Sequence, residues 1–453
     1  MHEHEVAALD AAIADLWGIA RAEGLDPMAT HFEIVPAPVL YEVAAYGLPG
    51  RFAHWSHGKA YQQMKTQYDF GLMKIFELIV HADPAQAFLL DSNDLFTNKF
   101  VAAHVLGHSD FFKHNAHFGT VPLDMDERVR LHAERIRAYE FAHGRREVEA
   151  YLDAVLAIQE HVDPWADEPA PLARVGVARP EPAAEAPAEA VPEPWEDLLE
   201  RRAAPEPPPA EPGRLAPGEG EDLLLVILRH APELKDWQRD VIALVRAESL
   251  YFQPYVRTKI MNEGWATFWH VRLLRRLRLT DAEYTEFARL NAGVRSPYPG
   301  AVNPYLLGVS IWEDICQREG LQRCFLVRES EDDLAFLRNH LSKEVARDLD
   351  MYVYQFQEDA WSVTDKAWEG VRDTLLQSRV HAGHPRIVAA DVDHHGSREL
   401  YLQHRHDGRE LDLEYAERTL QRVAQLWGRR VHLETQVDGK PKVLSCDPPP
   451  AAR

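Results

Sequence analysis

The chain has 453 residues and a mass of 51.7 kDa, a length that favours two or three structural units over one. It holds 50 Lys and Arg against 72 Asp and Glu, and the resulting net charge of −22 argues against broad nucleic-acid binding or docking on anionic lipid. The hydrophobic fraction of 46% excludes a wholly disordered chain, and the three cysteines form no CxxC pair of the kind found in zinc ribbons.

The N-terminal segment Glu5–Glu23 predicts an amphipathic helix, because acidic residues punctuate an apolar pattern of helical spacing. No basic segment precedes it, so it does not have the form of a signal peptide. The sequence also contains no run of about 18 apolar residues, and no membrane span is expected. These features predict a soluble, cytoplasmic protein.

Residues 1–165 are predicted to form the N-terminal helical half of a main domain. Helical patterns continue over Trp55–Val80, from the N-cap Ser92 to about His114, and over 126–141 and 145–161. Residues 166–220 then carry 13 of the chain's 30 prolines and a single aromatic residue, Trp195. Such a segment buries too little apolar surface to fold, and it predicts a disordered Pro/Ala-rich insertion, with residues 195–202 either a docking turn or a solvated helical patch.

Residues 221–360 are predicted to form the second helical half of the main domain. The clearest helical patterns there are 237–251 and Lys259–Leu277, whereas Leu223–Leu228 fits either a strand or a helix start. Residues 333–357 are predicted as mainly helical, with a possible strand at YVYQF.

Residues 361–440 are predicted to form a small α+β domain, and 441–453 a frayed tail. The domain is expected to contain these elements: a helix at 365–377, strands at 386–392 and 400–405, a helix at 413–426 and a strand at 431–435. The predicted fold class is therefore mainly α.

A pair of histidines lies in the motif AAHVLGHSDFF, within the helix predicted before residue 114. His104 and His108 are four residues apart, so both imidazoles lie on one helical face. This is how a helix presents two nitrogen atoms to one metal ion. The alternative is a pair of core histidines that bond to carboxylates or carbonyl groups.

A third ligand is expected from the motif KIMNEGWATFWH. Glu263 stands in an apolar and aromatic helix, where a carboxylate needs a cation, a proton or a metal, and His270 follows two helical turns later on the same face. Glu248 is a second carboxylate among apolar neighbours, and either residue is alternatively paired with a nearby Arg or Lys.

Two histidines from one helix and a later glutamate form the ligand set of zinc hydrolases with an HExxH motif. In this chain Val105 occupies the position of that motif's catalytic glutamate. A hydrolase therefore needs another base, for which Glu248 and Asp110 are candidates.

Two further clusters mix polar and aromatic residues, as substrate clefts and packed helix ends both do. The first, RFAHWSHGKAY, contains His54, His57, Lys59 and Tyr61; the second, SDFFKHN, contains Asp110, Lys113, His114 and Asn115. No phosphate-binding glycine loop or nucleophile motif accompanies them, so neither a nucleotide site nor a serine or cysteine hydrolase is predicted.

Several long segments together resemble the SpoVR (stage V sporulation protein R-like) family, in the order HWSHGKAY, QYDFGLMKIFELI, AFLLDSNDLFTNKFVAAHVLGHSDFFKHN, AIQEHVDPW, KIMNEGWATFWH, NPYLLGVSIWEDI and RELDLEYAERTLQRVAQLWGRRVHLET. The resemblance covers nearly the whole chain outside the 166–220 insertion. It implies a cytoplasmic bacterial protein linked to spore cortex formation or to stress, associated with an AAA+ serine protein kinase and a von Willebrand factor A-like protein. It implies no agreed catalytic activity.

Two functions are compatible with these observations. In the first, a helical, zincin-like body holds Zn²⁺ through His104, His108 and Glu263, with Glu248 or His270 as base or supporting group. Such a site would hydrolyse an amide bond in a peptide or a peptidoglycan-related substrate. In the second, the chain is a non-catalytic regulatory adaptor that partners the kinase and the von Willebrand factor A-like protein, and its histidines are core residues or a structural metal site.

Overall fold

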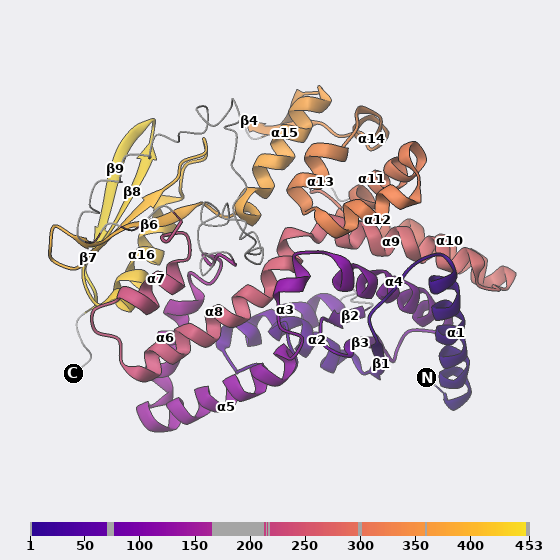
Figure 1. The fold of residues 1–453 in the computed structure, drawn as a ribbon, viewed down its shortest axis with the longest axis horizontal. Helices are drawn as coiled ribbons and strands as arrows, with labels where there is room; N and C mark the ends of the chain where they lie inside the picture. Colours follow the sequence, from indigo (N-terminus) through magenta and orange to yellow (C-terminus); the bar gives the residue numbers. More distant parts are fainter. Residues whose placement is uncertain are drawn as a thin grey trace, which may run out of the picture. The chain divides into compact units, whose positions relative to one another are not determined.

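A computed structural model describes residues 2–69, 77–164, 213, 215, 218–297, 301–357 and 360–449, and it is mainly helical (Figure 1). The described chain divides into two compact units. Unit 1 consists of Met1–Glu149 and Ala247–His384, and unit 2 of Ala150–Arg246 and Pro385–Arg453. The predicted insertion at 166–220, with the turn at 195–202, lies almost entirely outside the described residues.

The N-terminal part of unit 1 combines helices with a small sheet. Its elements are α1 (Glu3–Ala22), β1 (Thr30–Val35), α2 (Ala37–Tyr46), α3 (Trp55–Asp69), β2 (Glu77–Val80), β3 (Ala85–Leu90), α4 (Leu95–His114), η1 (Phe118–Thr120) and α5 (Met125–His143). The sheet has the order β1-β3-β2, with β1 parallel and β2 antiparallel to β3.

The helix predicted over Trp55–Val80 is therefore wrong in its last part, because β2 is a strand. A short apolar run fits either structure by periodicity alone, and here pairing with β3 decides for the strand.

The remainder of unit 1 is a helical layer. Its elements are the end of α8 (Asp236–Arg257), α9 (Lys259–Arg276), α10 (Asp281–Val294), α11 (Pro304–Glu319), α12 (Leu321–Ser330), α13 (Asp333–His340), α14 (Lys343–Asp348), the hairpin β4 (Val353–Gln357) and β5 (Ala360–Asp365), α15 (Trp368–Arg379) and η4 (Val380–Gly383). The possible strand at YVYQF is thus observed as β4. In this division α15 belongs to unit 1, whereas we expected residues 361–384 in the small α+β domain.

Helix α9 is the central element of unit 1, because nearly all of its side chains are buried. Two close approaches fix it between α4 and α11. A Cβ atom at Gly107 of α4 would lie 2.6 Å from the Cα of Ala266, and one at Gly264 would lie 2.4 Å from the carbonyl carbon of Gly308 in α11. Glycine at these contacts lets the helix backbones approach more closely than any larger residue allows.

Unit 2 contains the small α+β domain. The domain consists of β6 (Ile387–His394), β7 (Glu399–His404), α16 (Leu413–Trp427), β8 (Val431–Val437) and β9 (Lys440–Cys446). The other elements of unit 2 are most of α6 (Arg145–Leu156), α7 (Leu223–His230) and the start of α8. The sheet has the order β6-β7-β8-β9, and α16 forms the crossover between the parallel strands β7 and β8 and packs on the sheet (Figure 1).

The predicted strands and helix of this domain are present, and the ambiguous segment at Leu223–Leu228 is the helix α7. The frayed tail expected from residue 441 is wrong over β9, which pairs with β8 and buries Leu444. Across the described residues, no helix combines the length and apolarity that crossing a membrane requires.

Candidate metal centre

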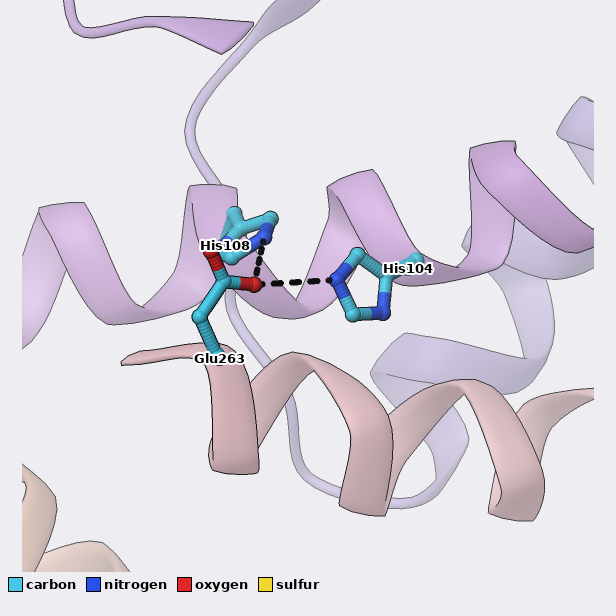
Figure 2. A group of neighbouring side chains, drawn as sticks. All are labelled: His104, His108 and Glu263. Atoms are coloured by element: carbon cyan, nitrogen blue, oxygen red, sulfur yellow. Dashed lines mark ion pairs between the residues drawn. The ribbon is translucent and has the colours of Figure 1, made fainter. Parts of the chain in front are cut away.

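Helices α4 and α9 bring three predicted ligands together. His104 and His108 extend from one face of α4 toward Glu263 on α9 (Figure 2). The Nε2 atoms of His104 and His108 lie 3.5 and 3.4 Å from the same carboxylate oxygen, Glu263 Oε2. One donor atom from each residue falls within 4.8 Å of the other two, and all three side chains are buried.

The far side of each imidazole is held by a hydrogen bond. His108 Nδ1 lies 2.8 Å from Asn262 Oδ1, and an amide oxygen only accepts, so Nδ1 carries the proton. His104 Nδ1 lies 2.9 Å from His270 Nδ1, while His270 Nε2 lies 3.2 Å from Asn291 Oδ1. By the same argument His270 is protonated at Nε2 and accepts from His104 Nδ1, provided that it is neutral.

The surroundings of His270 meet that condition. Burial, together with the neighbouring His104, holds the pKa of His270 well below its usual value, so the ring is neutral. Both ligand histidines therefore direct an Nε2 lone pair toward Glu263. Fixing the tautomer of a ligand imidazole through its other nitrogen is what groups around bound metals ordinarily do.

Glu263 is ionised in this environment. Burial alone would raise the pKa of Glu263, but the Lys259 ammonium opposes burial, and the pKa lies well below its usual value. Lys259 bonds the Oε1 atom, whereas the buried Oε2 atom makes no hydrogen bond within the described part of the chain. Two imidazole lone pairs and a carboxylate oxygen that face one another repel unless a cation lies between them.

The spacing of the donors fits a metal ion. Donor atoms about 2.0–2.2 Å from a tetrahedral Zn²⁺ lie roughly 3.4 Å from one another. Two of the three donor separations, the distances of 3.4 and 3.5 Å from the imidazole nitrogens to Glu263 Oε2, agree with that value. Two histidines and a carboxylate suit zinc and also iron(II), so the donor set selects a class of metal and does not select one element.

The centre lies just beneath the surface. His104, His108 and Glu263 are 3–6% exposed, while the Lys259 side chain beside them is half exposed. Val105, at the position of the missing HExxH glutamate, is fully buried in an apolar cluster and contributes no base.

Glu248, the other carboxylate considered as a base, belongs to a different cluster. Its Oε2 atom accepts from Arg51 Nε at 2.5 Å and its Oε1 atom bonds His132 Nδ1 at 2.8 Å, and the side chain is fully buried. Among the described residues, no contact joins Glu248 to the three candidate ligands. The alternative of a carboxylate paired with a nearby Arg or Lys therefore holds for Glu248, and it also describes Glu263, which pairs with Lys259. His270 lies directly behind His104.

In the two clusters of polar and aromatic residues at 51–61 and 109–115, Asp110 and His57 are buried and bonded to neighbouring residues. Asp110 accepts from Trp265 Nε1 at 2.9 Å and from Arg328 at 2.7 Å, so it joins α4, α9 and α12 and does not face the metal centre. His57 is buried against Phe52 and Arg51, and burial lowers the pKa of His57 to about 4. Lys59 is exposed.

Sequence reasoning missed the two asparagines that orient the imidazoles. Asn262 directly precedes Glu263, and its position on a buried helix is the signal that could have identified it, since a buried amide needs partners. Asn291 lies on α10 and left no signal in the sequence, because only the packing of α10 brings it to His270.

Comparison with known proteins places this chain in a family. A family model described as "SpoVR like protein" matches residues 3–384, and one described as "SpoVR-like C-terminal domain" matches residues 385–438. The junction of the two models coincides with the boundary between the units after His384. The chain is 28% identical to the "Uncharacterized protein YcgB" of Escherichia coli over 97% of this chain and 94% of that protein. No solved structure matches the chain.

Proposed function

This chain belongs to the SpoVR family, and from that premise we propose that it is a zinc metalloprotein with His104, His108 and Glu263 as protein ligands. The observation that carries the proposal is the convergence of two imidazole nitrogens, each oriented by a hydrogen bond at Nδ1, on one buried carboxylate oxygen. Three protein ligands leave a coordination position open, which is the pattern of catalytic zinc sites.

The activity we propose for this centre is hydrolysis of an amide bond in a peptide or a peptidoglycan-related substrate, with a base other than Glu248 and Asp110, which are bonded to other side chains. Zinc supplies Lewis-acid polarisation of the carbonyl group. Asn262 and His270 hold the imidazoles in the tautomers that bind metal, and Lys259 holds the carboxylate through Oε1. The proposed ligand pattern resembles that of zincins, because one helix would supply two histidines and a later helix the third ligand.

A second candidate function is favoured by the depth of the centre and by Val105. A metal site that is 3–6% exposed and lacks a carboxylate at the HExxH position also suits a structural metal. The protein would then be a regulatory adaptor for an AAA+ serine protein kinase and a von Willebrand factor A-like protein.

The deciding experiment is elemental mass spectrometry on untagged protein, for the wild type, His104→Ala and Glu263→Gln. His114→Ala is the matched control, because His114 ends the same helix but bonds Asp26 and lies outside the group. The proposal expects about one metal per wild-type and control chain and a loss in the other two variants. Metal-free wild-type protein after purification without chelator and supply of zinc would refute it.

Catalysis is tested separately, on the loaded wild type and on Glu263→Gln, with a panel of peptides and cell-wall precursor peptides analysed for cleavage by mass spectrometry. Cleavage by the wild type alone supports the hydrolase. If metal is bound, no substrate is cleaved, and His104→Ala lowers the thermal unfolding temperature sharply, the adaptor with a structural metal is favoured.

A further inference from the structure

A cavity of about 410 Å³ lies in unit 1 and contains none of the residues of the metal centre. It is formed by α14, the segment that follows it and the first turn of α15. The lining residues that matter for its chemistry are Lys343, Arg347, Tyr352, Lys366, Trp368 and Glu369. We refer to it as the basic cavity.

The charge of the basic cavity opposes that of the chain. Three cationic residues line it against one acidic residue, Glu369, whereas the whole chain carries a net charge of −22. Within the described part of the chain, Lys343 and Lys366 form no ion pair. Among the described residues, the one ion pair of Arg347 is with the adjacent Asp348, at 2.9 Å on the surface, and exposed pairs of this kind contribute little to stability.

The start of α15 adds hydrogen-bond donors to these cations. Ala367, the N-cap residue of this 12-residue helix, has no side chain that caps the first turn, and both Trp368 and Glu369 of that turn line the cavity. The first backbone N–H groups of a helix have no partner within the helix and carry partial positive charge, so they favour an anion.

Two aromatic rings line the same cavity. Tyr352 and Trp368 are partly exposed, and Lys366 Nζ lies 5.7 Å from the centre of the Tyr352 ring. A cavity with cationic groups and aromatic surface suits a ligand that combines an anion with an apolar or aromatic part. Its volume is within the range of sites for small organic molecules.

We propose that the basic cavity binds a small organic phosphate, with the phosphate group near Lys343, Arg347 and Lys366 and the organic part on Trp368 and Tyr352. A phosphate monoester offers three acceptor oxygens and close to two negative charges, which matches three cations and a helix start better than a carboxylate does. This inference is independent of the metal centre and of any hydrolase activity.

The test is isothermal titration calorimetry of the full-length chain with phenyl phosphate, inorganic phosphate and benzoate. We expect phenyl phosphate to bind with a dissociation constant below about 1 mM, more tightly than benzoate, and to bind more weakly as salt is added. Charge reversal in Lys343→Glu/Lys366→Glu should weaken the binding of phenyl phosphate at least tenfold, because each charge-assisted hydrogen bond that is lost costs roughly a factor of ten in affinity.

The matched control is Lys440→Glu/Lys442→Glu, which changes the net charge equally at two exposed lysines of strand β9. It should bind phenyl phosphate like the wild type. Trp368→Leu should weaken the binding of phenyl phosphate, whose ring would lie on Trp368, but leave the affinity for inorganic phosphate unchanged. The proposal is overturned if phenyl phosphate does not bind, if the control loses as much affinity as Lys343→Glu/Lys366→Glu, or if benzoate binds as tightly.

Discussion

Gly107→Ala should separate the metal ligands without unfolding the protein. The new Cβ atom would lie 2.6 Å from the Cα of Ala266, about 1 Å closer than ordinary van der Waals contact, and that neighbour is rigid helix backbone. Helices α4 and α9 would have to move apart by a comparable distance. The His104–Glu263 separation would then rise from 3.5 Å toward about 4.5 Å, beyond the roughly 3.4 Å that a tetrahedral Zn²⁺ requires.

The effects on stability and on metal binding should differ in size. Overpacking costs about 1–3 kcal/mol, while alanine in a helix gains about 1 kcal/mol over glycine, so the free energy of unfolding of the apo-protein should fall by about 0–2 kcal/mol. Zinc affinity should fall tenfold to a hundredfold, the range found when groups that orient a ligand are lost.

The assay is competition for Zn²⁺ against a chromophoric chelator, with urea unfolding of the apo-protein alongside. Gly18→Ala is the matched control, since Gly18 lies within helix α1 and, in the described part of the chain, the added carbon has no neighbour within 4 Å beyond the adjacent backbone of its own helix. It should keep full zinc affinity and be slightly stabilised. The reasoning fails if Gly107→Ala binds zinc as tightly as Gly18→Ala.

Four further predictions concern separate parts of unit 1. Asn262→Ala should lower zinc affinity tenfold to a hundredfold in the same competition assay, because His108 loses the acceptor that fixes its tautomer; an unchanged affinity would refute that role. Glu248→Gln should lower the free energy of unfolding in urea by about 3–5 kcal/mol, because it leaves the buried Arg51 guanidinium without its partner. The variant should retain the metal content of the wild type; loss of metal would indicate that Glu248 takes part in the metal centre. Burial lowers the pKa of His81 from 6.5 to about 4, so between these pH values the unfolded chain binds a proton that the folded chain does not. The contribution of neutral His81 to the free energy of unfolding is therefore fully present above pH 6.5 and is lost toward pH 4, by about 2 kcal/mol at pH 5. His81→Phe should remove this part of the pH profile of urea unfolding. Asp333→Ala should cost about 1–2 kcal/mol in thermal or urea unfolding, because its carboxylate accepts from two backbone N–H groups at the start of α9; a change below about 0.5 kcal/mol would contradict this.

Much of the candidate site could be predicted from the sequence, because its geometry follows from helical spacing. His104 and His108 are four positions apart and Glu263 and His270 are seven positions apart, and these separations fix which side chains share a helical face. Which groups pair across helices depends on packing. The partners of Glu248, Arg51 and His132, lie 197 and 116 residues away in the chain, and no local pattern links them.

The fold could be predicted where elements are long and periodic. Most of the long helices and the strands β6, β7 and β8 of the small domain were predicted on that basis, whereas β1, β2, β3, β5 and β9 were not. These strands are four to seven residues long, and at such lengths periodicity alone does not separate strand from helix or loop. β7 and β8 are no longer than these, but Gly396 and Gly428 mark the turns before them in the sequence. Only the pairing of strands distant in the chain determines them, as when β1 lies parallel to β3.

The distribution of the ligands along the chain has a consequence for biosynthesis. Glu263 is translated 155 residues after His108, which at about 5–20 residues per second is roughly 8–30 s later. During that interval a nascent chain exposes two histidines and the apolar face of α4 without the helix that covers them. If the chain binds metal, an ion acquired at that time would be held by two imidazoles alone, and firm loading would have to wait until α9 has left the ribosome and docked.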